Sequence, residues 1–126
     1  MTSPYEFFVP GYPMPAPRMT QRSKFTKRNQ KYLAYKALIG WSARQVIHTP
    51  FDANTRVSVD LEFFRTPSCK GDVDNLSKSI LDGMNKIAYE DDQQVKELHA
   101  LLTDCEEKSD EGVKVKVMEL SARGLV

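Results

Sequence analysis

The stretch VSVDLEFF (residues 57–64) contains the clearest strand signal in the sequence. Val57, Val59, Leu61 and Phe63 alternate with residues that are mostly polar. Successive side chains of a strand point to opposite faces, so this alternation is typical of a strand with one buried face and one solvent-facing face. We expect the fold to be built around this strand.

Two amphipathic helices are expected, one on each side of this strand in the sequence. The first runs from about Asn29 to a point before Pro50, because its apolar and aromatic residues recur every three or four positions and Trp41 widens the stripe. The second runs from about Asp74 to Ala88. Asp74 is its expected N-cap, because a short carboxylate accepts hydrogen bonds from the free N–H groups of the first turn. The buried stripe of the second helix is expected to contain Leu76, Ile80, Met84 and Ile87.

Three further strands complete the expected fold. They are YEFFV (residues 5–9), VKELHALL (residues 95–102), which is also compatible with a helix, and GVKVKVMEL (residues 112–120). The resulting order β-α-β-α-β-β predicts an α/β (α+β) fold with a mixed β-sheet of about four strands and two main helices. The length of 126 residues suits one core, so a single domain over residues 1–126 is expected.

The composition excludes several classes of protein. Hydrophobic residues make up 40% and charged residues 28%, which is ordinary globular usage and not that of a disordered or fibrous chain. No apolar run approaches the ~20 residues that cross a bilayer, and the N-terminus lacks the pattern of a signal peptide, so a cytoplasmic protein without a membrane association is expected. Cys69 and Cys105 form no CxxC pair and are expected to be thiols, and His48 and His99 are isolated surface residues.

Charge is distributed unevenly along the chain. The formal net charge is +1, yet residues 1–50 hold eight basic residues and one acidic residue, whereas the remainder holds ten basic and sixteen acidic residues. Four prolines between residues 10 and 17 keep the chain extended before the basic run, which favours an exposed loop that contacts a partner. A basic segment interleaved with aromatic residues suits nucleic acid, and a solvated surface that binds nothing is the alternative. The residues expected to contact nucleic acid are Arg18, Arg22, Lys24, Lys27, Arg28, Lys31 and Lys70.

Four carboxylates gather around the second helix, in the stretches GDVDNLSKSILDG and YEDDQQ. Asp72 and Asp74 are two residues apart in an extended approach to the helix, which places both side chains on the same side, so they can converge on one ion. Asp91 and Asp92 follow the helix. They can approach Asp72 and Asp74 only if the loop after Ala88 brings the chain back toward that pair. Mg²⁺ takes oxygen ligands and needs few carboxylates, so a metal site is one interpretation and a solvated acidic surface is the other.

Lys78 lies one helical turn after Asp74, with Asp82 a further turn along the same ridge. A cation at this position could pair with Asp74, stabilise the charge of a phosphorane-like transition state, or position a scissile phosphate. The alternative is a surface salt bridge worth about 0.3–0.5 kcal/mol. The spacing alone leaves these interpretations open.

The stretch GDVDNLSKSILDGMNKIAYEDDQQV resembles the signature of the RusA family of Holliday-junction resolvases. The shared pattern is Asp-x-Asp-Asn-Leu-x-Lys, then a helix, then an Asp-Asp pair followed by Gln and Val. An early strand, a proline-rich turn, a basic stretch and a Tyr-containing helix also occur in the family's order. The resemblance implies that Asp72, Asp74 and Asp92 bind metal, that Lys78 is an active-site cation, that Asn75 supports the start of the helix, and that Asp91 is a bystander.

The resemblance also implies a function. It implies a homodimeric, Mg²⁺-dependent enzyme in which Mn²⁺ can replace Mg²⁺. It also implies action on four-way DNA junctions by paired symmetric nicks, which leave 5′-phosphate and 3′-hydroxyl ends. We therefore expect a Holliday-junction resolvase of DNA recombination and repair, with Asp72, Asp74, Lys78 and Asp92 as catalytic residues. One alternative is a non-catalytic nucleic-acid-binding module whose carboxylates are a helix cap and a solvated turn. Another is a structural protein whose proline-rich loop docks against a partner.

Overall fold

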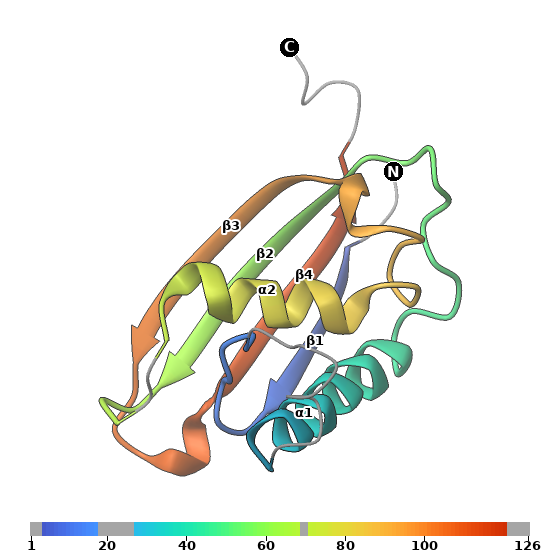
Figure 1. Cartoon of the computed structure of the whole chain (residues 1–126). Coiled ribbons are helices and arrows are strands. Elements are labelled where there is room, and N and C mark those ends of the chain that lie inside the picture. The colour runs from blue at the N-terminus through green and yellow to red at the C-terminus, as the bar shows by residue number, and fades with distance from the viewer. Residues whose placement is uncertain (1–3, 18–26, 69–70, 121–126) are drawn as a thin grey trace.

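A mixed four-stranded sheet carries both main helices on one of its faces (Figure 1). The structure, a computed structural model, describes residues 4–17, 27–68 and 71–120. Its elements in chain order are β1 (Tyr5–Pro10), α1 (Lys27–Arg44), β2 (Val57–Arg65), α2 (Val73–Met84), η2 (Asp92–Gln94), β3 (Val95–Asp104), η3 (Lys108–Asp110) and β4 (Gly112–Glu119). The predicted fold class and the predicted order of strands and main helices are confirmed.

The strands lie in the order β1-β4-β2-β3 across the sheet. Strand β4 is antiparallel to both β1 and β2, whereas β3 is parallel to β2. Parallel neighbours need a crossover connection, and here the crossover contains α2, which therefore lies across the sheet (Figure 1). In register, Leu61 of β2 lies between Val115 of β4 and Ala100 of β3. Strands β1 and β3 are the two edges.

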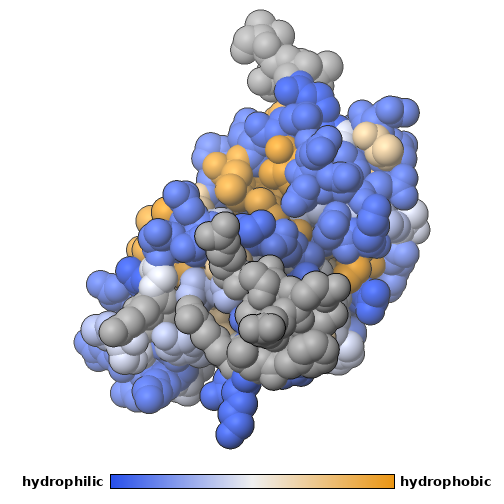
Figure 2. Space-filling view, viewed as in Figure 1, coloured by the Kyte–Doolittle hydropathy of each residue, from blue (hydrophilic) through white to orange (hydrophobic). Residues whose placement is uncertain are grey.

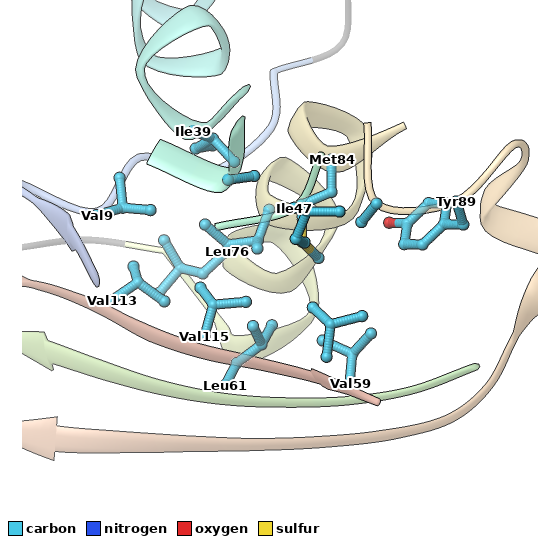
Figure 3. Close-up of a cluster of buried hydrophobic side chains, with 14 of the residues drawn as sticks. Val9, Ile39, Ile47, Val59, Leu61, Leu76, Met84, Tyr89, Val113 and Val115 are labelled. Carbon is cyan, nitrogen blue, oxygen red and sulfur yellow. The ribbon is translucent and has the colours of Figure 1, made fainter. Parts of the chain in front are cut away.

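The core lies between the sheet and the helices (Figure 3). Val59 and Leu61 of β2 are buried on this side, as the alternation predicts, and Leu76 of α2 faces the sheet from above. The two helices approach each other closely: a Cβ on Gly83 would lie 2.7 Å from Cγ2 of Ile39, which is too close for any larger residue without a shift. Glycine at this position therefore allows α1 and α2 to cover the sheet together.

Helix α2 ends at Met84 and not at the predicted Ala88. Its C-cap, Asn85, has an extended backbone (φ −60°, ψ 131°), and Lys86 has a positive φ of 72°. Lys86 donates its N–H to the carbonyl of Tyr89 at 2.9 Å, so the chain turns back in a tight loop. The apolar spacing misled the prediction because Ala88 is buried from this loop just as it would be from a helix.

Helix α1 ends at Arg44, and the chain after it stays tightly turned because the N–H of Ile47 still reaches the carbonyl of Ala43 at 2.8 Å. Trp41 does not widen the buried stripe as predicted, since 61% of its surface is exposed. The helix packs against α2 and β1, so the side that carries Trp41 is left uncovered. No helix among the described residues is long and apolar enough to cross a membrane.

The structure describes both histidines and one of the two cysteines. His48 and His99 are exposed, as predicted. Cys105 is a thiol, also as predicted, and Cys69 lies outside the described residues.

Candidate active site along helix α2

Asp72 and Asp74 lie at the start of α2. Asp72 is the N-cap: its backbone is extended (φ −90°, ψ 169°), and its Oδ1 accepts a hydrogen bond from the N–H of Asn75 at 2.9 Å. Asp74, the predicted N-cap, lies in the first turn instead. The prediction is wrong because both acids suit the positive end of the helix dipole, and only the backbone angles distinguish the cap from the first turn. Asp72 and Asp74 are both exposed.

The proline-rich segment packs against the same end of α2. Ala16 donates its N–H to the carbonyl of Asn75 at 3.1 Å, and the hydroxyl of Ser79 donates to the carbonyl of Met14 at 2.6 Å. Gly71 has a φ of +116°, and a Cβ there would lie 3.1 Å from a proline side chain of this segment, so the position suits glycine. The chain therefore enters its basic run from a point fixed beside the two acids.

The basic run falls partly within the described structure. Lys27 and Lys31 are exposed on α1, and Arg28 belongs to the first turn of the same helix. The described part of the basic run thus forms the start of α1, the helix that packs against α2. The other predicted DNA contacts, Arg18, Arg22, Lys24 and Lys70, lie outside the described residues.

Lys78 lies one turn after Asp74, and 63% of its side chain is exposed. Its Nζ is 3.5 Å from Oδ2 of Asp82, so its ion pair is made toward the C-terminal end of the helix. An exposed pair of this kind contributes about 0.3–0.5 kcal/mol, which leaves the ammonium able to exchange Asp82 for a phosphate. Asp82 also lies beside α1, where burial, together with the charge of Asp82, raises the pKa of Tyr32 to about 12.

The two acids after α2 have different structural roles. Asp91 is the N-cap of η2, and its Oδ1 accepts a hydrogen bond from the N–H of Gln93 at 2.9 Å. Asp92 is the first residue of η2. Partial desolvation and, after it, the hydrogen bond and charge of Asp91 raise the pKa of the Asp92 carboxyl; the charge of Asp82 adds to this rise and Lys78 opposes it. Asp92 therefore lies within electrostatic reach of Lys78 and Asp82.

The acids form two groups at opposite ends of α2. Asp74 and Asp82 are eight residues apart, and a helix rises about 1.5 Å per residue, which separates them by about 12 Å. Asp72 belongs with Asp74, whereas Asp92 belongs with Asp82, and Lys78 lies between the groups. Among the described residues, no three His, Cys, Asp or Glu side chains are arranged to hold one metal ion.

Comparison with known families covers most of the chain. The sequence profile of a family described as endodeoxyribonuclease RusA matches residues 10–118, a range that contains both acidic groups, Lys78 and the whole basic run. The chain belongs to the RusA endodeoxyribonuclease family. No curated protein sequence matches it. Membership in the RusA family confirms the resemblance and the expected class of enzyme, a Holliday-junction resolvase that hydrolyses phosphodiester bonds.

Gln94 of this RusA-family chain has a role that the sequence did not reveal. The residue is buried, and its Oε1 accepts hydrogen bonds from the N–H groups of Glu90 at 2.8 Å and Asp91 at 3.0 Å. Its Nε2 donates to the carbonyls of Asp52 at 2.6 Å and Thr55 at 3.0 Å. One amide thus ties the turn with the acidic pair to a loop 42 residues earlier. The capping-box spacing of Asp91 and Gln94 could have indicated the bonds to the turn, whereas no local pattern indicates the bonds to the distant loop.

The donor chemistry at the N-terminal end of α2 fits a hard cation. Mg²⁺ is usually bound through one or two carboxylates together with water and substrate phosphate. Asp72 and Asp74 supply two carboxylates that solvent reaches, and since Asp72 uses one oxygen for the cap, an ion there would be bound by its other oxygen. Asp92 lies toward the far end of the helix, so the described residues of this RusA-family chain do not assemble all three acids around one ion.

Proposed function

We propose that the protein is a Mg²⁺-dependent, structure-selective endonuclease that resolves Holliday junctions by paired symmetric nicks in DNA recombination and repair. It would act in the cytoplasm, as a homodimer bound to four-way junction DNA. The observation that carries this proposal is that Asp74 and Lys78 lie one turn apart on α2, beside the anchored proline-rich segment that leads into the basic run. This arrangement supports a site at which a metal ion and a phosphate can meet.

The proposed catalytic residues are Asp72, Asp74, Lys78 and Asp92. The three acids are the proposed metal ligands, and the first two are supported by their exposed positions at the start of α2. Asp92 is preferred to Asp91 because the resemblance to the family signature assigns this role to Asp92, whose carboxylate caps neither α2 nor η2. A bound Mg²⁺, or Mn²⁺ in its place, supplies a water of lowered pKa and polarises the phosphoryl oxygen. Lys78 neutralises the negative charge that develops on the phosphate, and its exposure keeps the ammonium accessible.

The proposed DNA contacts are phosphate contacts. They come from Arg18, Arg22, Lys24, Lys27, Arg28, Lys31 and Lys70. Such contacts fix register and orientation and carry no sequence information directly, so these residues would recognise the shape of the junction. A four-way junction has approximate two-fold symmetry, and a C2 dimer offers one active site to each strand that is cut.

Cleavage of three DNA substrates tests the proposal. A synthetic four-way junction, a flap and a linear duplex of the same sequence are incubated with the protein, with Mg²⁺ and with EDTA. We expect symmetric nicks in the junction with Mg²⁺, and neither nicks with EDTA nor comparable cleavage of the duplex. Equal cleavage of all three substrates would show a nuclease without selectivity for junctions.

One observation favours a non-catalytic nucleic-acid-binding module. Asp72 and Asp91 each cap a helix, which is the role that this alternative assigns to the carboxylates. Capping does not account for Asp74 and Asp92, which are exposed and cap neither helix. Junction binding without Mg²⁺-dependent scission in the three-substrate assay would favour the binding module over the nuclease.

A further inference from the structure

Strand β3 has an outer edge to which no other described strand is bonded. It is the last strand in the order β1-β4-β2-β3 and pairs with β2 alone. Such an edge presents a row of unpaired N–H and C=O groups, and proteins usually protect it with charges, prolines or bulges. Here the register irregularity lies at the very start of the strand, and the middle of β3 reads Leu-His-Ala-Leu-Leu. The centre of this edge has no proline or bulge, and the ion pair between Glu97 and His99 leaves the residues from Ala100 to Leu102 uncharged.

Apolar side chains of β3 are exposed beside α2. Leu98, Ala100 and Leu102 lie opposite buried residues of β2 and hence point to the face that carries the helices. Leu98 is nevertheless 42% exposed, so α2 does not cover this side chain. On the other face, Leu101 is 57% exposed. Figure 2 shows uncovered hydrophobic surface on the helix-bearing side of the molecule, over β3 and beside α2.

We propose that β3 pairs with β3 of a second copy of this chain, antiparallel, about a two-fold axis at Ala100. An axis perpendicular to the sheet reverses the strand direction and keeps each face on its own side. Residues that lie directly opposite each other must then share a face, so their numbers must add up to an even number. In every register that meets this condition, the axis passes beside a residue that lies opposite the same residue of the second copy.

The side chains select one of these registers. With the axis at Ala100, Leu98 lies opposite Leu102 and Lys96 lies opposite Asp104 of the partner. The regular part of the strand is then paired, with Leu98 opposite Leu102 and His99 opposite Leu101, and an ion pair lies at each end, where Lys96 is the extra residue of the register irregularity. Moving the axis by one residue instead places Lys96 opposite Leu102 in one direction or Leu98 opposite Asp104 in the other. Of these three registers, the one at Ala100 pairs Leu98 with Leu102 and opposite charges at both ends.

This pairing would join the sheets of the two copies into one, with all four main helices on the same face. Both α2 helices would then present their acids on the side where DNA is bound. The inference deepens the proposed function and rests on it, because it names the surface through which the proposed resolvase dimerises. Its test measures assembly and not cleavage, so either can fail without the other.

Charge exchange at the ends of the pairing tests the register. Sedimentation velocity of the full chain should show a dimer. Lys96→Glu would place Glu opposite Asp104, and Asp104→Lys would place Lys opposite Lys96, so each single change should weaken the dimer by about tenfold or more. The double variant restores opposite charges and should return the dimer toward wild-type affinity. A monomeric wild type, or single variants that dimerise as tightly as wild type, would overturn the proposal.

Cysteine cross-linking provides a second measurement at the axis. In a Cys69→Ser, Cys105→Ser background, Ala100→Cys should form a disulfide dimer on mild oxidation, because opposite Cα atoms of antiparallel strands lie about 4.5–5.5 Å apart. Leu98→Cys is the matched control: its copies would be four residues out of register, about 14 Å apart, and should stay monomeric on non-reducing gels. Equal cross-linking of both variants, or none with Ala100→Cys, would refute the register.

Discussion

Gln94→Leu tests whether a single buried amide holds the turn that carries Asp92. The Gln94 residue is 6% exposed and makes four hydrogen bonds of 3.0 Å or shorter to backbone groups, two as acceptor and two as donor. Leucine has a similar volume and can make none of these bonds. The substitution therefore removes the polar function of the side chain with little change in packing.

The expected loss of stability follows from the four backbone groups left behind. A buried group that loses its partner costs about 1–3 kcal/mol, and one that water can reach costs less. An open cavity of about 260 Å³ lies beside this turn, lined by Asn54, Asp91 and Gln94 among others, so water can reach some of the groups. We therefore expect the free energy of unfolding to fall by about 2–4 kcal/mol, at or below the lower limit of about 4 kcal/mol for four fully buried groups.

Urea unfolding followed by circular dichroism measures this loss. For a domain of this size the midpoint should fall by about 1–3 M. Gln93→Leu is the matched control, because Gln93 is exposed, and its free energy of unfolding should change by no more than about 0.5 kcal/mol. At a temperature where Gln94→Leu is folded, junction cleavage should still be reduced, since Asp92 is no longer held. An unchanged urea midpoint for Gln94→Leu would refute the reasoning.

Three further outcomes are expected. Lys78→Ala should change the free energy of unfolding by less than about 0.5 kcal/mol, because its pair with Asp82 is exposed, yet should slow single-turnover cleavage by about 10²–10³. Hydrogen bonds from Thr66 lower the pKa of Glu111, so the folded state binds fewer protons than the unfolded state below about pH 4.5. The free energy of unfolding therefore falls as the pH drops through this range. Glu111→Gln should make this fall smaller when urea unfolding at pH 7 is compared with urea unfolding at pH 4. Alanine at four basic positions should reduce the salt dependence of junction binding by a slope of about 0.9 for each phosphate that the protein no longer neutralises, and an unchanged slope would remove these residues from the DNA-binding surface. These positions are Arg22, Lys24, Lys27 and Arg28.

Strand alternation predicted the sheet well because one face of each central strand is buried. Val59 and Leu61 could be assigned to the core from their spacing alone, and they are buried as expected. Strand β3 was the harder case, since it is an edge and most of its side chains are exposed. Its short length and its position after α2 decided the interpretation, and the parallel pairing with β2 could not be derived from its own pattern.

Helix ends were predicted less well, because the deciding interactions are backbone interactions. Asp72 and Asp74 both suit the start of a helix, and only the extended backbone of Asp72 makes it the cap. At the other end, the apolar spacing continues past Met84 to Ala88, although the positive φ of Lys86 has already ended the helix. Periodicity reports which residues are buried, and a loop can bury them as well as a helix can.

The residues of the candidate site could be chosen from sequence, but their arrangement could not. The signature singled out Asp74, Lys78 and Asp92 together, whereas the structure places Asp92 in η2, within electrostatic reach of Asp82. The loop that follows α2 sets the position of Asp92, and the path of this loop could not be derived from the sequence. The anchoring of the proline-rich segment through Ala16 likewise depends on contacts between parts of the chain that are distant in sequence.

Cleavage by Asp74→Asn is the most direct test of the central claim that the acids of α2 belong to a nuclease active site. The assay compares wild type, Asp74→Asn and the control Asp110→Asn, an exposed residue of η3, on a four-way junction with Mg²⁺, and measures binding in parallel by gel shift. We predict that Asp74→Asn binds the junction at least as tightly as wild type, because a repulsive charge near phosphate is removed, but does not cut it. Asp110→Asn should cut like wild type. Nicking by Asp74→Asn at the wild-type rate would contradict the account.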